Sequence, residues 1–283
     1  MNRLWEGDKI AITGTNLSGL LRLLDEPDEQ RADPLIEHIA EMPIEDRDAL
    51  LDQATGLARS NVKRAVVRAR YLALESQWEA LRRRFDLEQA LTLISTTGDS
   101  GAALPVRAKL DEYAEEVGER LSGDRAFDDG LGAIATVLAQ KHNLRGNVGD
   151  YYSPDNSYLG SVLATGLGIP ISLCCVAILI GRRLELPISG IGTPGHFLGF
   201  YGDVDLKIGR FFDPFGGFIA LTMGKLQNIL SQHVTSIDPG MLTPVTDREI
   251  VQRSIRNIAF CYAKLNQPEH IRNLDRWNML LTA

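Results

Sequence analysis

The sequence predicts an α+β fold, with a helical N-terminal lobe, a buried helix on a small antiparallel sheet, and a C-terminal helical hairpin. Three observations support this. Apolar residues recur at helical spacing through residues 61–143. A segment that is apolar on nearly every side follows at residues 170–184, as in a buried helix. Short β-like runs, bounded by Gly and Pro, come only after that helix.

Composition and charge exclude several classes of protein. With 44% hydrophobic and 24% charged residues among 283, the chain has globular proportions. Its net charge of -7 argues against a protein built to bind nucleic acid or anionic lipid. Three Cys, two of them adjacent, form no disulfide framework and indicate a reducing compartment. No secretory signal is visible in residues 1–9, and no apolar run is long enough to cross a membrane. We therefore expect a cytoplasmic protein.

Charge is unevenly distributed near the N-terminus. Residues 25–52 hold eleven Asp or Glu against two Arg, whereas residues 59–84 hold eight Lys or Arg against two Glu. The basic stretch has helical apolar spacing and predicts one long helix over residues 61–85. We favour an acidic segment lying near this helix over an anion-binding helix, because nearby acids would cancel its field.

The next segments also predict helices. Asp86 and Gln89 form a plausible capping box for a helix over residues 86–96. Pro105 suits the first turn of a second helix, and a third is predicted over residues 129–142. After a loop at residues 144–157, a short helix over residues 157–164 precedes the buried one.

The remaining chain combines strands and helices. Pro170 is a good first residue for the buried helix, which is followed by predicted strands over residues 188–191, 196–201, 208–213 and 218–221. A helix over residues 225–230 comes next. Two amphipathic stripes, over residues 251–265 and 271–281, form the final hairpin. We therefore divide the chain into an N-terminal helical extension (1–85), a central domain (86–232) and a C-terminal hairpin (245–283).

His196 and Asp213 are the most informative polar pair. If the turn between their strands is centred between Val204 and Asp205, antiparallel pairing sets His196 opposite Asp213, with Cβ atoms about 5 Å apart. A carboxylate beside an imidazole fixes its tautomer and raises its basicity. The pair could line a pocket or form a purely structural hydrogen bond, and Asp213 could also shape the turn before Pro214.

Four motifs now carry a family resemblance. RGNVGDYYSPDNSYLGSVL (residues 145–163), GIPISL (168–173), GTPGHFLGFY (192–201) and FFDPFGG (211–217) resemble the SirB-type transglutaminase-like proteins, within the papain-like transglutaminase superfamily. The resemblance covers residues 86–230, and the C-terminal helices are similar to the tetratricopeptide-like tail of many members. It implies a papain-like, transglutaminase-like core. Residues 1–85 lie outside it.

The resemblance also implies a catalytic geometry. Active members use a Cys that opens the buried helix, a His that opens a strand and an Asp before a Pro; His196 and Asp213 match the last two. Pro170 occupies the Cys position, so the resemblance implies a pseudoenzyme. Ser172 and Cys174 remain candidate nucleophiles. We favour core packing for Cys174 and hydrogen bonding to first-turn N–H groups for Ser172.

Other motifs bear on ligands. Tyr151, Tyr152 and Asn156 belong to the first motif and could wall a cleft, although Asn156 could equally cap the helix starting at Ser157. The five His show no ligand spacing with each other or with Cys, so we predict no metal site. GIGTPG at residues 190–195 leads into a strand rather than a helix, which argues against dinucleotide binding. We therefore expect no cofactor.

Two functional hypotheses follow. The first is a non-catalytic module whose cleft, lined by His196 and Asp213, binds a peptide or protein partner but neither nucleic acid nor membrane. The second is a hydrolase or acyl-transferase in which Ser172 or Cys174 is the nucleophile, His196 the base and Asp213 the orienting group. We favour the first, because the thiol expected at the helix start is absent.

Overall fold

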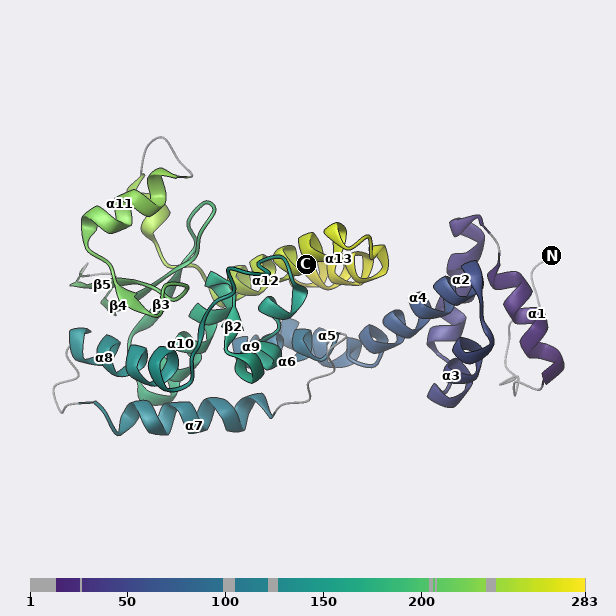
Figure 1. The fold of residues 1–283 in the computed structure, drawn as a ribbon, viewed down its shortest axis with the longest axis horizontal. Coiled ribbons are helices and arrows are strands. Elements are labelled where there is room, and N and C mark those ends of the chain that lie inside the picture. The colour runs from purple at the N-terminus through teal and green to yellow at the C-terminus, as the bar shows by residue number, and fades with distance from the viewer. Residues whose placement is uncertain are drawn as a thin grey trace. The chain divides into compact units, whose positions relative to one another are not determined.

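The computed structural model divides the chain into two compact units, residues 1–75 and 76–283 (Figure 1). It describes residues 14–25, 27–98, 105–121, 127–203, 206, 208–232 and 238–282. The predicted absence of a secretory signal in residues 1–9 and the predicted turn centre at Val204 and Asp205 concern residues outside these ranges. The three-part division predicted from the sequence stays a prediction.

The first unit contains four helices within the described residues: α1 (Gly14–Leu24), α2 (Glu29–Ala40), α3 (Ile44–Gln53) and α4 (Gly56–Leu72). Their core includes Leu24, Ile39, Leu50 and Val62. The acidic segment packs on the basic helix, since Arg64 contacts Asp33 at 2.6 Å and Arg68 contacts Glu37 at 2.9 Å. The expectation that acids lie near this helix is confirmed.

The prediction of one helix over residues 61–85 is wrong. Helix α4 ends at Leu72, and α5 (Glu75–Arg83) begins after a short turn. The backbone N–H of Leu74 donates to the carbonyl of Tyr71, three residues back, so the helix tightens and stops there. Apolar spacing continues across the turn, and periodicity alone therefore missed the break.

Several helices of the second unit precede its antiparallel sheet in the chain. They include α6 (Leu87–Ser95), α7 (Val106–Gly118) and α8 (Phe127–Ile134), which continues as a π-helix over Ala135–Lys141. Half of the predicted capping box is present: the Asp86 carboxylate accepts a 2.7 Å hydrogen bond from the Gln89 N–H, whereas the described structure has no return bond from the Gln89 side chain. Pro105 caps α7 from just outside it.

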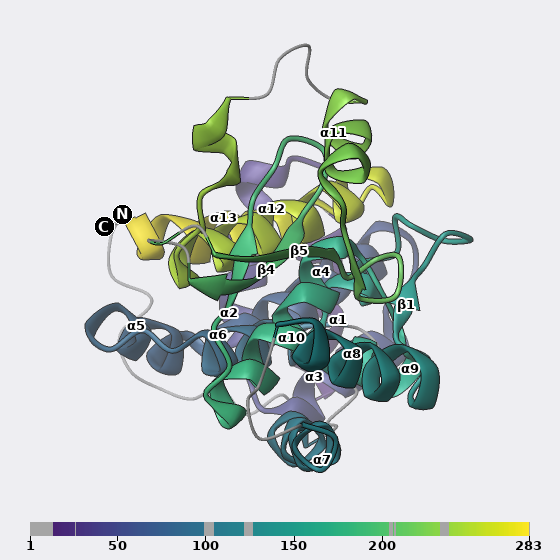
Figure 2. The ribbon, with the colours of Figure 1, turned by 90° about the vertical axis from the view of Figure 1, so that its left-hand side faces the viewer.

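The second unit also contains the sheet. Its antiparallel order is β3 (Ile188–Ile191), β4 (Leu198–Asp203), β5 (Ile208–Asp213) and β6 (Ile219–Ala220). Two short parallel strands, β1 (Arg145–Gly146) and β2 (Leu167–Gly168), flank α9 (Leu159–Thr165). The buried helix α10 (Pro170–Leu184) lies between α7 and this sheet, and α11 (Met223–Ser231) covers the other sheet face (Figures 1 and 2). The predicted α+β fold is confirmed.

The predicted register of the central hairpin is wrong by two residues. Tyr201 pairs with Arg210, whereas the predicted turn sets Ile208 opposite Tyr201. Strand β4 starts only at Leu198, because a bend containing Gly195, with φ of 68°, precedes it. His196 therefore precedes β4 instead of opening it, yet its ring still reaches the Asp213 carboxylate at the end of β5.

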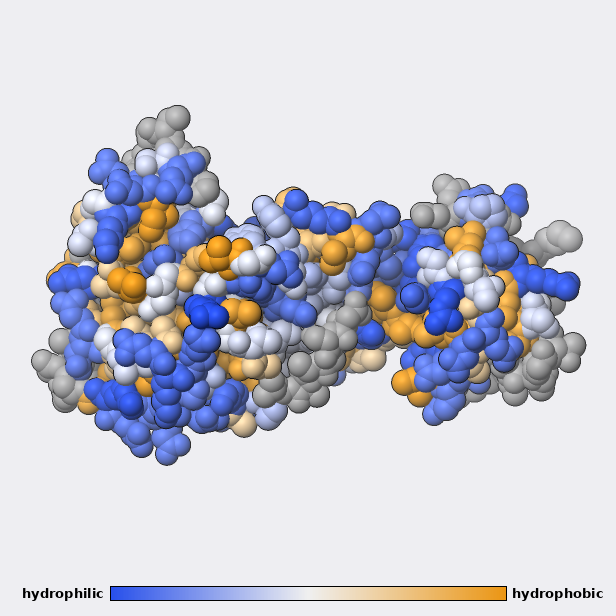
Figure 3. All heavy atoms as spheres, in the orientation of Figure 1, coloured by the Kyte–Doolittle hydropathy of each residue, from blue (hydrophilic) through white to orange (hydrophobic). Residues whose placement is uncertain are grey.

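The chain ends in a helical pair. Helix α12 (Asp247–Lys264) begins with a capping box between Thr246 and Glu249, and α13 (Pro268–Thr282) runs alongside it (Figure 1). The Trp277 indole stacks on Trp78 of α5 with ring centroids 4.4 Å apart. On the face drawn in Figure 3, hydrophobic residues of each unit are scattered among hydrophilic ones. No helix in the described part of the chain is long and apolar enough to span a membrane.

Trp277→Ala tests how strongly the stacked indoles hold α13. We expect the free energy of unfolding to fall by about 3–5 kcal/mol, because the substitution leaves a cavity beside Trp78. Urea denaturation followed by circular dichroism measures the change. Met223→Ala, at an exposed position on α11, is the control and should change stability little; an equal effect of both substitutions would contradict the prediction.

Candidate functional site

A small pocket lies at the N-terminal end of α10. Its volume is about 140 Å³. Three segments distant in sequence line it: the first turn of α10, the bend before β4 and one side of α12, joined by Tyr151 from the loop that precedes α9. The pocket therefore forms where the buried helix, the sheet and the C-terminal pair meet.

His196 and Asp213 meet beside this pocket. His196 Nε2 lies 3.2 Å from Asp213 Oδ1, and both side chains are half-buried. The same carboxylate oxygen accepts a 3.0 Å hydrogen bond from the Phe215 N–H, which fixes its position. Among the described residues, His196 Nδ1 has no hydrogen-bond partner. The structure therefore brings the predicted pair together.

The first turn of α10 contains no accessible nucleophile. Pro170 is the first helical residue, after the N-cap residue Ile169. The Ser172 hydroxyl is 5% exposed; it lies 2.6 Å from the Asn156 carbonyl, to which it donates, and accepts a 3.0 Å bond from the Ile169 N–H. Its single proton and one lone pair are thus used within the protein, and no hydrogen bond joins it to His196 in the described structure.

Cys174 lies one turn further along α10 and is completely buried. Its Sγ lies 3.5 Å from the Leu198 carbonyl. Burial raises the pKa of the Cys174 thiol well above its ordinary value, and the nearby Cys175 and Asp213 act in the same direction. Burial also raises the pKa of Cys175, to about 12, and that of Cys261. Because the thiolate is the nucleophilic form, these environments suppress thiol chemistry at all three positions.

The loop before α9 is held by Asn156. Its buried amide donates to the carbonyls of Asp150, at 2.6 Å, and Tyr151, at 3.1 Å, and accepts a 2.8 Å bond from the Asn147 amide. Asn156 caps no helix, since Tyr158 is the N-cap residue of α9. It instead positions the segment that presents Tyr151 to the pocket.

Tyr151 and Tyr152 have different surroundings. Tyr151 lines the pocket, and burial is the largest factor raising its pKa. Tyr152 lies outside the lining and is about half exposed, with its ring centroid 5.8 Å from that of Phe260 on α12. The two tyrosine rings contact each other edge-on at 5.4 Å.

Arg253 and Asn257 of α12 also line the pocket, and sequence reasoning missed both. Arg253 Nη2 donates to the carbonyls of Thr193, at 2.8 Å, and His196, at 2.7 Å, and so ties α12 to the bend before β4. Their spacing of four residues places the two polar side chains on one helix face. That spacing was the available signal, but we treated the final helices as a separate tail.

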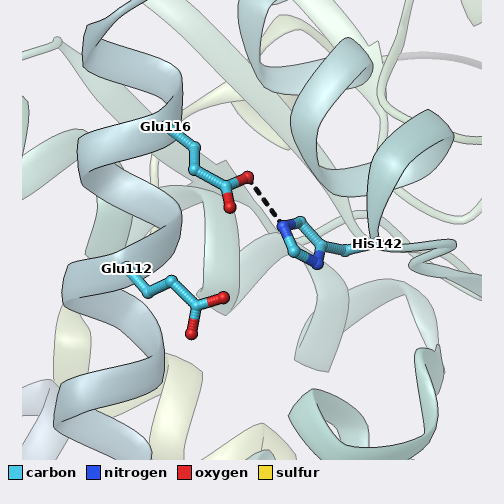
Figure 4. A group of neighbouring side chains, drawn as sticks. All are labelled: Glu112, Glu116 and His142. Atoms are coloured by element: carbon cyan, nitrogen blue, oxygen red, sulfur yellow. Dashed lines mark hydrogen bonds and ion pairs between the residues drawn. The ribbon is translucent and has the colours of Figure 1, made fainter.

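A second cluster of titratable groups joins α7 to the end of the π-helix. Glu112, Glu116 and His142 offer ligand atoms that all lie within 4.8 Å of one another (Figure 4). His142 Nε2 lies 2.7 Å from a Glu116 oxygen. Lysine ammonium groups sit 2.8 Å from each carboxylate, Lys109 at Glu112 and Lys141 at Glu116. These cations already balance the acids, so the cluster is accounted for as an ion-pair network.

Comparisons with known proteins match the same part of the chain. A profile of the transglutaminase-like superfamily matches residues 105–256. A UPF0162 protein of Xylella fastidiosa strain Temecula1 is 34% identical over 157 residues, which cover 52% of this chain and 51% of that protein. F-box only protein 21 of Homo sapiens is 32% identical over 134 residues, covering 45% and 21% respectively. The chain thus aligns with about half of the length of this curated bacterial relative. It aligns with 21% of the human protein. No solved structure gives a significant match.

Glu116→Gln tests the ion-pair network through pH. Burial raises the pKa of the Glu116 carboxyl, but hydrogen bonds from Lys141 and His142 outweigh it and lower this pKa below its ordinary 4.5. The carboxylate's contribution to stability is therefore present above pH 4.5 and lost as the pH falls through the lowered value.

We expect Glu116→Gln to reduce the free energy of unfolding by roughly 1 kcal/mol at pH 7. The difference from the unsubstituted protein should vanish in acid. Thermal denaturation between pH 3 and pH 7 measures it, with the exposed neighbour Glu115→Gln as control. A difference that persisted unchanged at the lowest pH would show that the carboxylate charge does not stabilise this network.

Proposed function

The chain belongs to the transglutaminase-like superfamily, and from this premise we propose that it is a SirB-type pseudoenzyme that binds a peptide or protein segment without covalent chemistry. The binding site is the pocket beside His196 and Asp213. The observation that carries the proposal is Pro170 at the first position of α10, where active members place the nucleophilic Cys. A proline side chain has no group that attacks a carbonyl.

The two other candidate nucleophiles also support a binding role. The Ser172 hydroxyl is engaged by Asn156 and Ile169, and using it as a nucleophile would require breaking these buried bonds. Cys174 is enclosed by the core, and its raised pKa keeps it protonated at neutral pH. Both environments favour binding over the hydrolase or acyl-transferase hypothesis.

The pocket has the size and chemistry of an anchor site. About 140 Å³ is smaller than the roughly 300–1,000 Å³ of sites that enclose drug-sized ligands, so one side chain or chain end fits better. The His196 ring nitrogen, the Tyr151 phenol and the Asn257 amide offer hydrogen bonds, and Ile169 and Ile171 add apolar groups to the lining. This combination suits one residue of a longer segment.

Three of the four motifs that resemble the SirB-type proteins contribute residues to the pocket lining, namely Tyr151, the first turn of α10, and Gly195 with His196. This supports placing the site of a SirB-type protein here. A peptide or protein partner is the class of ligand that we propose, with no cofactor.

Panning a phage-displayed random peptide library on the full chain tests this proposal. We expect recovered peptides to bind the unsubstituted protein and to lose at least tenfold in affinity for Asn257→Trp, because an indole would fill the pocket. Asn228→Trp, at an exposed position on α11, is the matched control and should bind normally. Fluorescence anisotropy with labelled synthetic copies measures the affinities.

Two results would overturn the proposal. Peptides that bind Asn257→Trp as well as the unsubstituted protein do not use this pocket. A covalent adduct on Ser172 or Cys174, detected by mass spectrometry after incubation with peptide thioesters and lost in His196→Ala, would identify an acyl-transfer enzyme instead.

Restoring a thiol at the helix start tests the inferred loss of the nucleophile. We expect Pro170→Cys to react with iodoacetamide at pH 7 about tenfold faster than Ile208→Cys, an ordinary exposed thiol on β5. The helix N-terminus and the His196 imidazole both favour the thiolate at position 170. His196→Ala in the Pro170→Cys background should remove most of the advantage. Equal rates at the two positions would mean that this pocket is not the remnant of a thiol site.

A further inference from the structure

We propose that the segment bound at this pocket is acidic, and that the basic face of α12 recognises its carboxylates. The basic face consists of Arg253, Arg256 and Lys264. This inference rests on the proposed function, because it names the chemical class of the peptide that the pocket takes.

The first support is the charge of α12. The whole chain has a net charge of -7, yet residues 250–264 hold three cations and no Asp or Glu. The acids of this helix lie at its start, where Asp247 pairs with Arg182 and Glu249 closes the capping box. Arg253 and Arg256 are three residues apart, and Lys264 follows eight residues later, so the three cations lie on one side of α12. The basic face therefore extends from the pocket along α12.

Of the three cations of the basic face, Arg253 is the one that lines the pocket. It is half-buried, and its Nη2 is directed to the two carbonyls of the bend before β4. No carboxylate of the described residues pairs with it, and none of them accepts from its other N–H groups. Burial, with help from Arg256, lowers the pKa of Arg253, as expected for a cation without a counter-ion. A ligand carboxylate would supply the missing negative charge at the pocket wall.

Aromatic rings continue the surface outward from the pocket. We call Tyr151, Tyr152 and Phe260 the aromatic strip; their rings contact in sequence at 5.4 Å and 5.8 Å. Lys264 Nζ lies 4.3 Å from the Tyr152 ring and 5.1 Å from that of Phe260. Phe260 is 55% exposed and Tyr152 51%. Exposed rings bordered by cations suit a peptide that alternates acidic with apolar side chains better than a small anion, which would not cover the rings.

Two carboxylates near this surface oppose the basic face. Asp150, in the loop next to the aromatic strip, is exposed and acts electrostatically on Cys261. Asp213, beside the pocket, is already held by the His196 ring and the Phe215 N–H. The three cations of the basic face outnumber these two carboxylates, so the local charge favours an acidic ligand.

A pair of labelled pentapeptides with blocked ends tests the inference. The acidic probe is Asp-Phe-Glu-Leu-Asp, and its neutral twin is Asn-Phe-Gln-Leu-Asn. We expect the full chain to bind the acidic probe about tenfold more tightly at low salt, and this advantage to shrink as salt screens the charges. Fluorescence anisotropy measures both affinities.

Substitutions localise the effect. Arg256→Gln and Lys264→Gln each should weaken binding of the acidic probe about threefold or more and leave the neutral twin unaffected. Lys225→Gln, at an exposed position on α11, removes the same charge elsewhere and should change neither affinity. Arg253→Lys keeps the charge but not the planar fork; thermal denaturation checks that its fold is retained.

Equal affinity for the two probes would overturn the inference that the ligand is acidic. So would an affinity for the acidic probe that stays unchanged in the double variant Arg256→Gln, Lys264→Gln. The proposed function would stand in that case if panned peptides still lost affinity for Asn257→Trp. If the panned peptides bind Asn257→Trp as tightly as the unsubstituted protein, the proposed function itself is wrong.

Discussion

Burial of the first turn of α10 is the constraint on which the site depends. A helix start exposes backbone N–H groups, and within the core these need protein acceptors. Pro170 removes one donor, and the Ser172 hydroxyl accepts from the N–H of Ile169 while donating to the Asn156 carbonyl. The loop, the bend before β4 and α12 then close around this end. The Ser172 hydroxyl is thus used to make the helix start compatible with burial.

Beside this helix start, the His196 imidazole is held on two sides. The Asp213 carboxylate holds one nitrogen of the His196 ring, and Arg253 holds the carbonyl of the same residue. The imidazole is therefore oriented from both its ring and its backbone. An oriented ring that faces a small polar pocket can recognise a ligand with little loss of conformational entropy.

Much of the core could be predicted from the sequence, because its signals are local or depend on alternation. Apolar residues on every side of residues 170–184, with Pro170 at the start, predicted α10, and the predicted meeting of His196 and Asp213 withstood a two-residue error in register. The error arose in the assumed centre of the turn, which the pairing of Tyr201 with Arg210 moves by one residue and which periodicity does not reveal. The bend around Gly195, which delays the start of β4, was hidden in the same way. Arg253 was missed because its role depends on how α12 packs against a segment 57 residues away.

The position of α12 has a consequence for dynamics. One helix both closes the pocket and belongs to the C-terminal pair, so a ligand that contacts its basic face binds only while that helix is docked. Mass action then links the two equilibria, and occupancy must slow local opening of α12. Amide protons along this helix would report ligand occupancy even though most of them never touch the ligand.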